Sequence, residues 1–212
     1  MQSLCVRCSD SAPDRLSGLS ISHTLETNEV RSTVQRKAGT ALSSEELDSP
    51  GSGLKHHALG SIITSQYASS WDMLLETVKS FPEDEWQKAE IDYFVPARIA
   101  YHAIETVDFY LRDDLTAFKW GWRFGVDWDR ALPTELPNQR DTLAYLHEIR
   151  RQAAEWISEG GDKGMLKTDS RFHAEGISHL DRALYVLRHT HHHIGELCAE
   201  LRRRNLPRPG WR

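Results

Sequence analysis

The sequence predicts an all-α protein: a four-helix bundle with a long loop between its second and third helices and a disordered N-terminal extension. Three observations support this prediction. Four stretches place apolar residues three and four positions apart, which is the period of an amphipathic helix. No stretch alternates apolar and polar residues as a half-buried strand would. The chain also contains no internal repeat of fixed period and no glycine-rich phosphate loop.

The chain divides by composition into two parts. Residues 1–55 contain few large apolar side chains and many small, polar or charged ones, as in the stretch AGTALSSEELDSPGSG. Such a segment buries too little apolar surface to offset the entropy lost on ordering, so we expect a disordered extension here. Residues 56–212 are therefore expected to form the bundle, which is the size of one ordinary domain.

The first two helices are expected on either side of a short break. The first spans about residues 58–80 and ends at the stretch FPEDEW. The second begins at Pro96, because proline suits the first turn of a helix. Its sequence, PARIAYHAIETVDFYLRDDL, carries an apolar stripe and a single histidine, His102.

The last two helices follow a long aromatic segment. The stretch TAFKWGWRFGVDWDRALPTELP contains several glycines and prolines, which is typical of an ordered loop packed by its own side chains. The third helix is expected over residues 137–161, where Gly160 and Gly161 are natural C-terminal stops. The fourth is expected from about Ile177 to Arg204.

The fourth helix contains the sequence LRHTHHHIGELCAEL, in which four of the first seven residues are histidines. A heptad pattern predicts that its buried seam consists of Leu180, Leu184, Leu187, His191, Ile194, Cys198 and Leu201. On a wheel of 100° per residue, His192 faces solvent. His189 and His193 fall together at the edge of the apolar stripe, where we expect the wall of a cleft.

Two histidines four residues apart can bind one metal ion from a single helical face. A third ligand would have to come from another helix, and His102 borders the apolar side of the second. Spacing alone leaves other interpretations open. Exposed histidine faces are common, and a lone histidine at a core boundary is more often satisfied by one hydrogen bond.

Two segments together resemble the DinB-like (damage-inducible) superfamily of four-helix bundles: PARIAYHAIETVDFYL and LRHTHHHIGELCAELRRRNLPRPGW. The resemblance implies a DinB/YfiT-like bundle in which His102, His189 and His193 bind a divalent metal. Glu196 departs from the family pattern, where glutamine is more common. An acid there would add a carboxylate, act as a catalytic proton acceptor, or remain exposed. The resemblance does not reach the N-terminal extension.

Three imidazoles would leave positions on a zinc, nickel or iron ion for water or substrate. Such an ion lowers the pKa of bound water or stabilises a thiolate, which indicates a hydrolase or a transferase that moves a small thiol onto an electrophile. Relatives in the superfamily include thiol-dependent S-transferases and maleylpyruvate isomerase-like proteins. Glu105 and Asp108 are further candidates to orient a ligand, and the loop aromatics that could line a substrate cleft are Trp120, Trp122, Phe124 and Trp128.

A second hypothesis is a non-catalytic, metal-stabilised bundle, monomeric or homodimeric, that serves as a stress-related binding or scaffold protein. The net charge of −5 argues against a nucleic-acid partner. We interpret the basic run LRRRNLPR as a complement to the end of the last helix. No apolar run suits a secretory signal or a membrane span, so we expect a cytoplasmic protein without a membrane partner.

The remaining cysteines and histidines are expected to have no role at a metal. Cys5 and Cys8 form a lone CVRC pair without the further ligands that structural zinc needs, and Cys198 suits the packing of a small apolar side chain. His147 is expected to face solvent on the third helix, His173 lies in a loop before the fourth, and His179 is almost three turns before His189, too far along the axis to share its ion.

Overall fold

The computed structural model describes residues 58–112, 114–169 and 177–211. These residues form four α-helices and three short 3₁₀ turns, and they contain no strand beyond an isolated bridge between Thr168 and Ser178. The α-helices are α1 (Leu59–Lys79), α2 (Pro96–Leu111), α3 (Gln139–Met165) and α4 (His179–Arg203). The turns are η2 (Glu83–Glu85), η3 (Asp92–Phe94) and η4 (Pro133–Glu135). The all-helical prediction is therefore confirmed for the described part of the chain.

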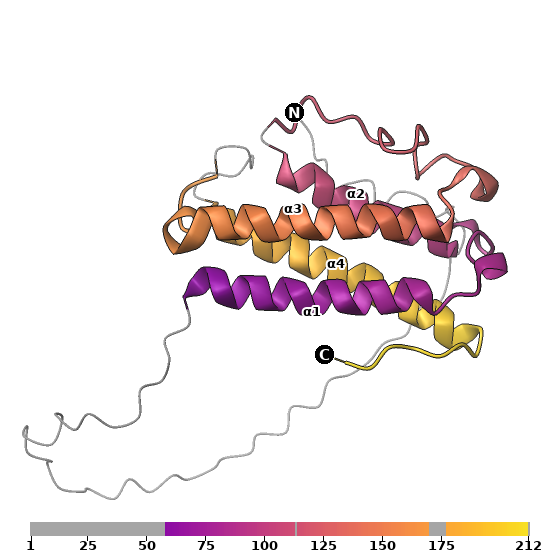
Figure 1. Cartoon of the computed structure of the whole chain (residues 1–212). Coiled ribbons are helices and arrows are strands. Elements are labelled where there is room, and N and C mark those ends of the chain that lie inside the picture. The colour runs from indigo at the N-terminus through magenta and orange to yellow at the C-terminus, as the bar shows by residue number, and fades with distance from the viewer. Residues whose placement is uncertain (1–57, 113, 170–176, 212) are drawn as a thin grey trace, which may run out of the picture. The chain divides into compact units, whose positions relative to one another are not determined.

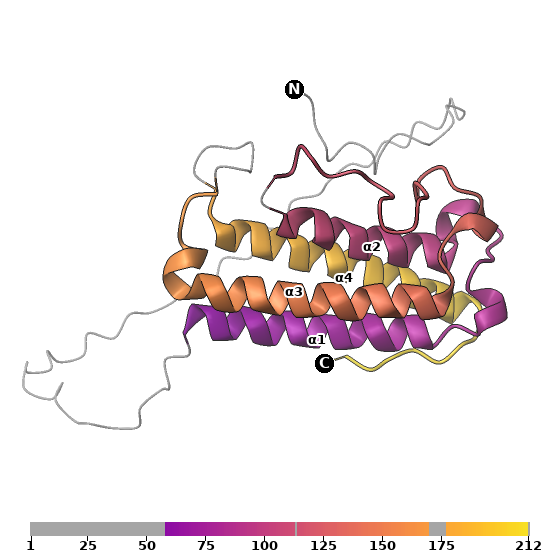
Figure 2. The ribbon, with the colours of Figure 1, turned by 45° about the horizontal axis from the view of Figure 1, so that its top comes forward.

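The four helices pack as a bundle in which α1 and α2 are not direct neighbours. Each of these two helices packs against both α3 and α4, as Figures 1 and 2 show from two directions. The pairing of α2 with α4 brings His102 to the face that carries the histidine run. The segment between α2 and α3, residues 112–138, contains no α-helix among its described residues.

The helix ends follow from local chemistry. Pro96 occupies the first turn of α2. Asn138 caps α3 by accepting a hydrogen bond from the amide of Asp141, and Ser178 forms a reciprocal capping box with Asp181 at the start of α4. Asn205 takes a positive φ of 56° after α4, where the chain turns back.

The prediction that the third helix ends at Gly160 and Gly161 was wrong in part. Gly161 does leave helical geometry, with a φ of 51° that suits glycine. The chain then resumes a helical turn that runs to Met165. The reason is packing: the Met165 side chain is fully buried, and this extra turn places it in the interior.

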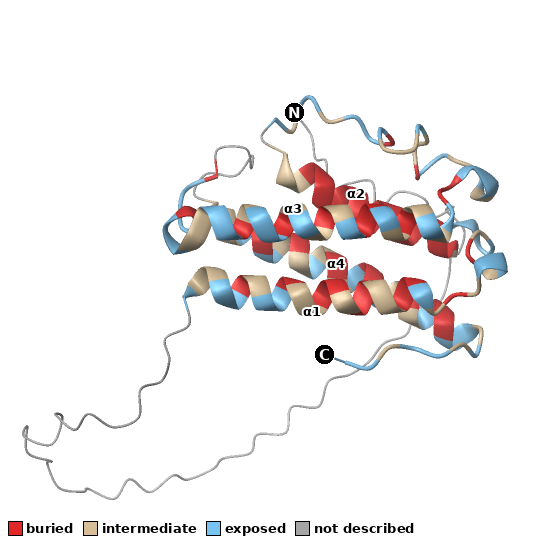
Figure 3. Cartoon of the chain, in the orientation of Figure 1, coloured by how far each residue is buried: buried red, intermediate tan, exposed pale blue. Residues whose placement is uncertain are grey.

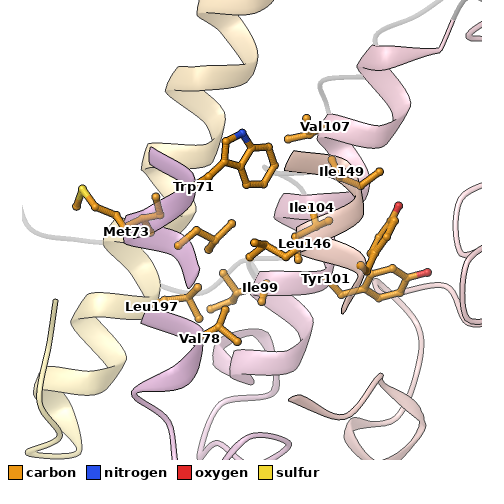
Figure 4. Packing of buried hydrophobic residues seen from close by; sticks show 14 of the residues in the cluster. Trp71, Met73, Val78, Ile99, Tyr101, Ile104, Val107, Leu146, Ile149 and Leu197 are labelled. Carbon is orange, nitrogen blue, oxygen red and sulfur yellow. The ribbon is translucent and has the colours of Figure 1, made fainter. Parts of the chain in front are cut away.

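The core consists of large apolar side chains from all four helices, shown as buried positions in Figure 3 and as side chains in Figure 4. Helix α2 is buried along nearly its whole length, from Pro96 to Phe109. Residues at the centre of the packing include Trp71, Val78, Ile99, Ile104, Val107, Leu146, Ile149 and Leu197.

The predicted seam of α4 was wrong by about one residue. Leu184 is 46% exposed, and Leu180, Leu187, His191 and Cys198 are only partly buried. The helix instead buries Ala183, Val186, Thr190, His193 and Leu197, together with Ile194 and Leu201 from the predicted set.

The seam prediction failed because a heptad pattern of apolar residues leaves out polar residues that find partners in the folded chain. Thr190 is 3% exposed, and its hydroxyl donates to the carbonyl of Val186 one turn earlier. Arg182 is 1% exposed, and its Nε lies 2.9 Å from the carboxylate of Asp169. Both residues can therefore face the interior, and the rotation of α4 carries His193 with them.

Candidate metal centre

The structure brings the three predicted ligands together across the interface between α2 and α4. The ring centre of His102 lies 4.7 Å from that of His193 and 5.1 Å from that of His189. His189 and His193, one turn apart on α4, have ring centres 4.4 Å apart and Nε2 atoms 3.1 Å apart. One nitrogen from each ring can be chosen so that all three lie within 4.8 Å of one another. Two nitrogens on one tetrahedral zinc ion are separated by roughly 3.3 Å, so this spacing suits a shared ion.

The hydrogen bonding of these rings also fits a metal ion. His102 is 9% exposed, and neither of its ring nitrogens has a hydrogen-bond partner among the described residues. The buried Nδ1 of His189 likewise has none within that part of the chain. Buried polar groups normally have partners, so the unpaired nitrogens of His102 and His189 suit ligands of a divalent transition ion, to which His193 would add the Nε2 atom that faces His189.

Burial keeps His102 and His189 neutral. Loss of hydration, followed by the charges of His193 and His189, holds the pKa of His102 well below its ordinary value. Loss of hydration also lowers the pKa of His189 to about 3, with smaller contributions from His193 and His192. Neutral imidazole is the form that binds metal, so both side chains are ready to act as ligands near neutral pH.

Glu196 supports His193 from the outer side of the cluster. Its Oε2 lies 2.7 Å from His193 Nδ1, while its Oε1 lies 3.3 Å from His192 Nε2 and accepts a 3.4 Å hydrogen bond from the Tyr93 hydroxyl. Partial burial raises the pKa of Glu196, but the hydrogen bond and charge of His193, the charge of His192 and the hydrogen bond from Tyr93 together lower it. The carboxylate thus accepts the Nδ1 proton and leaves His193 Nε2 directed into the cluster.

A second group that could hold an ion shares one residue with the first. His192, His193 and Glu196 can bring one ligand atom each within 4.8 Å of one another. His192 is exposed, as the helical wheel predicts, so this group lies at the surface. It also lacks the unpaired buried nitrogens of the first, because Glu196 already pairs with both histidines.

Of the four loop aromatics predicted to line the site, Trp128 contacts the cluster. Its ring centre is 3.9 Å from that of His102, and the side chain is 8% exposed. Trp120 and Trp122 are 37% and 44% exposed. Phe124 packs on Tyr101 and Tyr145 instead. Trp128 therefore covers one side of the cluster.

The predicted orienting roles of Glu105 and Asp108 were wrong. Neither acid is hydrogen-bonded to His102, whose ring nitrogens have no partner among the described residues, and both bind the loop after α2. Glu105 Oε1 accepts hydrogen bonds from the Gly121 amide at 2.6 Å and from the Tyr101 hydroxyl at 3.3 Å. Asp108 Oδ2 accepts from the Tyr145 hydroxyl at 2.7 Å and from Trp122 Nε1 at 3.1 Å. Asp108, six residues beyond His102, lies on another face of the helix, while Glu105, three residues beyond, is drawn to the Gly121 amide of the loop.

Sequence reasoning missed two residues near the cluster, Tyr93 and Arg98. Tyr93 lies in η3 and reaches Glu196 from outside the predicted helices. Arg98 is 4% exposed and lies one turn before His102 on α2. The sequence contained one signal for Arg98: it precedes His102 by four residues and so lies on the same side of α2. A charged residue on that buried side requires a partner.

The other histidines do not join the cluster. His147 is exposed on α3, and the ring of His179 lies 5.9 Å from that of Trp156. His191 Nε2 lies 2.7 Å from Ser70 Oγ, which already donates to the carbonyl of Gln66. The predictions for the extension over residues 1–55, for Cys5 and Cys8 and for His173 lie outside the described residues.

Two cavities lie apart from the histidines. One of about 530 Å³ runs between α1 and α3 and is lined by residues including Gly60, Thr64 and Asp162. The other, of about 280 Å³, is lined by residues including Arg112, Phe118 and Trp122. No histidine of the cluster lines either cavity.

Fold and site together define a class: an all-helical bundle with a buried three-histidine cluster between two of its helices. Among the described helices, none has the length and apolar character needed to span a membrane. No protein-family model matches the chain, and no curated protein matches it at a significant level.

Proposed function

We propose that this protein is a divalent-metal-dependent enzyme of the DinB-like superfamily, of the thiol S-transferase or hydrolase type. The observation that carries the proposal is the meeting of His102, His189 and His193, in which both ring nitrogens of His102 and Nδ1 of His189 are buried without a partner among the described residues. These residues would hold zinc, nickel or iron. Bound there, the ion would supply a nucleophile at neutral pH by lowering the pKa of a bound water or thiol.

The remaining residues of the site would orient and shield this centre. Glu196 accepts the Nδ1 proton of His193 and is itself partly exposed, so it is also the candidate proton acceptor during turnover. Trp128 excludes water from the side of His102. A small thiol or electrophile would approach from the side of His189 and Glu196, which are the partly exposed members of the site.

A second candidate function is a metal-stabilised bundle with a binding or scaffold role. The observation that favours it is the burial of the ligands: His193 is 2% exposed, and Trp128 covers His102. A closed site of this kind is typical of a metal that contributes folding energy rather than catalysis.

The first experiment is metal analysis of tag-free protein beside a His189→Ala, His193→Ala double variant. One equivalent of zinc, nickel or iron in the parent and none in the variant is the expected result. A single His147→Ala variant is the matched control, because that histidine is exposed on α3 and belongs to neither group that could hold an ion. A parent that takes up no metal after loading at neutral pH would overturn both candidate functions.

Activity then separates the two candidates. Metal-loaded protein is assayed for conjugation of small thiols to 1-chloro-2,4-dinitrobenzene and for hydrolysis of p-nitrophenyl esters. Turnover that disappears in the double variant supports the enzyme. Full metal occupancy without turnover in either assay, combined with a rise in the melting temperature on metal binding, supports the metal-stabilised bundle.

A further inference from the structure

Arg98 is a buried arginine that ties two separate segments to α2. Its guanidinium lies 3.0 Å from both carboxylate oxygens of Asp92 in η3, and its Nε donates to the Asp92 carbonyl at 3.3 Å. The same guanidinium donates to the carbonyl of Ala131 at 2.8 Å and to that of Trp128. One side chain thus joins the segment before α2 to the loop that follows it.

Both of these segments also carry a side chain that contacts the histidine cluster. Trp128, whose carbonyl Arg98 holds, places its ring against His102. Tyr93, the residue after Asp92, donates to Glu196, which in turn accepts from His193. The backbone beneath each contact is therefore fixed by the same guanidinium. The two contacts reach the cluster from different sides, one through α2 and the other through α4.

A buried arginine can also have a purely structural role, and Arg204 provides a comparison for Arg98. Arg204 also joins separate segments through backbone carbonyls. Its side chain is 9% exposed and donates to the carbonyls of Glu85 at 3.0 Å and Lys88 at 2.7 Å. It also pairs with the carboxylate of Glu200. Neither Glu85 nor Lys88 touches the histidines, so Arg204 stabilises the fold without acting on the cluster.

We propose that Arg98 is a positioning residue of the metal centre. It holds Trp128 over His102 and Tyr93 against Glu196, so that the three imidazoles keep their orientation and a bound ion exchanges slowly. This inference rests on the proposed metal-binding function. Arginine is required because its planar fork donates to a carboxylate and to three carbonyls at once, whereas the ammonium group of lysine has no such geometry.

The test uses Co²⁺ as the probe, because its visible absorption reports ligand geometry. Full-length protein is compared with Arg98→Lys, Asp92→Asn and Arg204→Lys variants. The rate at which EDTA removes Co²⁺ should rise about tenfold in Arg98→Lys, with a changed absorption band, since outer contacts of metal ligands alter affinity by roughly 10–100-fold. Asp92→Asn should act in the same direction and more weakly, because it retains a hydrogen-bond acceptor for the guanidinium.

The Arg204→Lys variant makes the test specific. It should lose stability to urea, as Arg98→Lys does, while its Co²⁺ band and removal rate stay within a factor of two of the parent. Equal rates in the parent and Arg98→Lys would overturn the positioning role, as would an equal acceleration in Arg204→Lys. If Arg98→Lys does not fold, Asp92→Asn decides the question by the same two readouts. Failure of the parent to bind Co²⁺ would instead overturn the metal centre itself.

Discussion

Helix α2 buries polar side chains in two regions, and these regions differ in how their polar atoms are satisfied. Toward α3 and the following loop, Asp108 is fully buried and accepts hydrogen bonds from Tyr145 and Trp122 on one oxygen, while Arg112 pairs with the other. Toward α4, His102 is nearly as buried, yet neither ring nitrogen has a partner within the described residues.

This difference in hydrogen bonding distinguishes a residue that supports the fold, Asp108, from a candidate ligand, His102. A buried carboxylate with three donors holds the loop after α2 in place and offers nothing further to a ligand. A buried imidazole with both nitrogens unpaired is costly, and two more histidines on α4 face it. Charge and burial alone do not distinguish these two regions. The number of paired atoms does distinguish these two side chains: both oxygens of Asp108 have partners, whereas neither nitrogen of His102 has one within the described residues, so an added ion would complete the bonding of His102.

The largest effect is expected for His102→Ala, which removes one ligand and leaves the others in place. The affinity for zinc should fall on the order of 100-fold, because a two-histidine remnant on one helix binds an ion weakly. Competition with a chromophoric chelator measures this loss. His147→Ala should bind as the parent does. An unchanged affinity in His102→Ala would mean that the surface group of His192, His193 and Glu196 binds the ion instead.

Asp108→Ala should lower the stability of the fold and leave zinc affinity nearly unchanged. Removing the carboxylate leaves the Tyr145 hydroxyl, the Trp122 indole and the Arg112 guanidinium without their acceptor, so the free energy of unfolding should fall by about 3 kcal/mol. Zinc affinity should change less than threefold. Urea denaturation of the metal-free protein measures the first quantity, and chelator competition measures the second. A large loss of zinc affinity in this variant would break the distinction between the two regions of α2.

The positions of the helices could be predicted closely from the sequence, because their ends depend on local chemistry. The expected first helix over residues 58–80 is α1 over Leu59–Lys79, and Pro96 begins α2 as predicted. The rotation of α4 could not be predicted in the same way. It depends on Thr190 and Arg182, whose polar groups are satisfied by an i−4 carbonyl and by Asp169. A hydropathy pattern counts both residues as exposed.

The candidate site was predictable where spacing within one helix determines it. The separation of four residues between His189 and His193 fixes their shared face, whatever the rest of the fold does. The choice of His102 depended on the resemblance and on its being the single histidine of that helix. Contacts between distant segments had no comparable signal. Arg98 meets Trp128 and Ala131 some thirty residues later, and only the three-dimensional path of the loop brings them together.

Glu105 is a buried carboxyl group on α2 that should make the stability of the protein depend on pH. Loss of hydration raises its pKa to about 7, against an ordinary value of 4.5, although hydrogen bonds from Gly121 and Tyr101 oppose the shift. Below pH 4.5 the side chain is protonated in both folded and unfolded chains. As the pH rises from 4.5 to 7 the unfolded chain loses its proton first, so the free energy of unfolding should fall, by about 3 kcal/mol.

The Glu105→Gln variant tests this assignment. It should lack that decrease between pH 4.5 and 7, because glutamine does not titrate and can still accept the hydrogen bond from the Gly121 amide. Urea denaturation at several pH values measures the difference between the parent and the variant, which cancels contributions from other groups. Parallel profiles for the two proteins would show that Glu105 does not titrate differently on folding. Zinc affinity at fixed pH should be the same in both.

Glu196→Gln should weaken zinc binding less than His102→Ala does, because all three ligands remain and only the support of one of them weakens. A neutral amide accepts the Nδ1 proton of His193 less strongly than a carboxylate does, so zinc affinity should fall about tenfold. Assays at saturating zinc then test the catalytic role predicted for Glu196. If it only orients His193, the turnover of saturated enzyme should return to nearly the parent rate. If it also accepts a proton, kcat should stay at least 100-fold lower while zinc is fully bound.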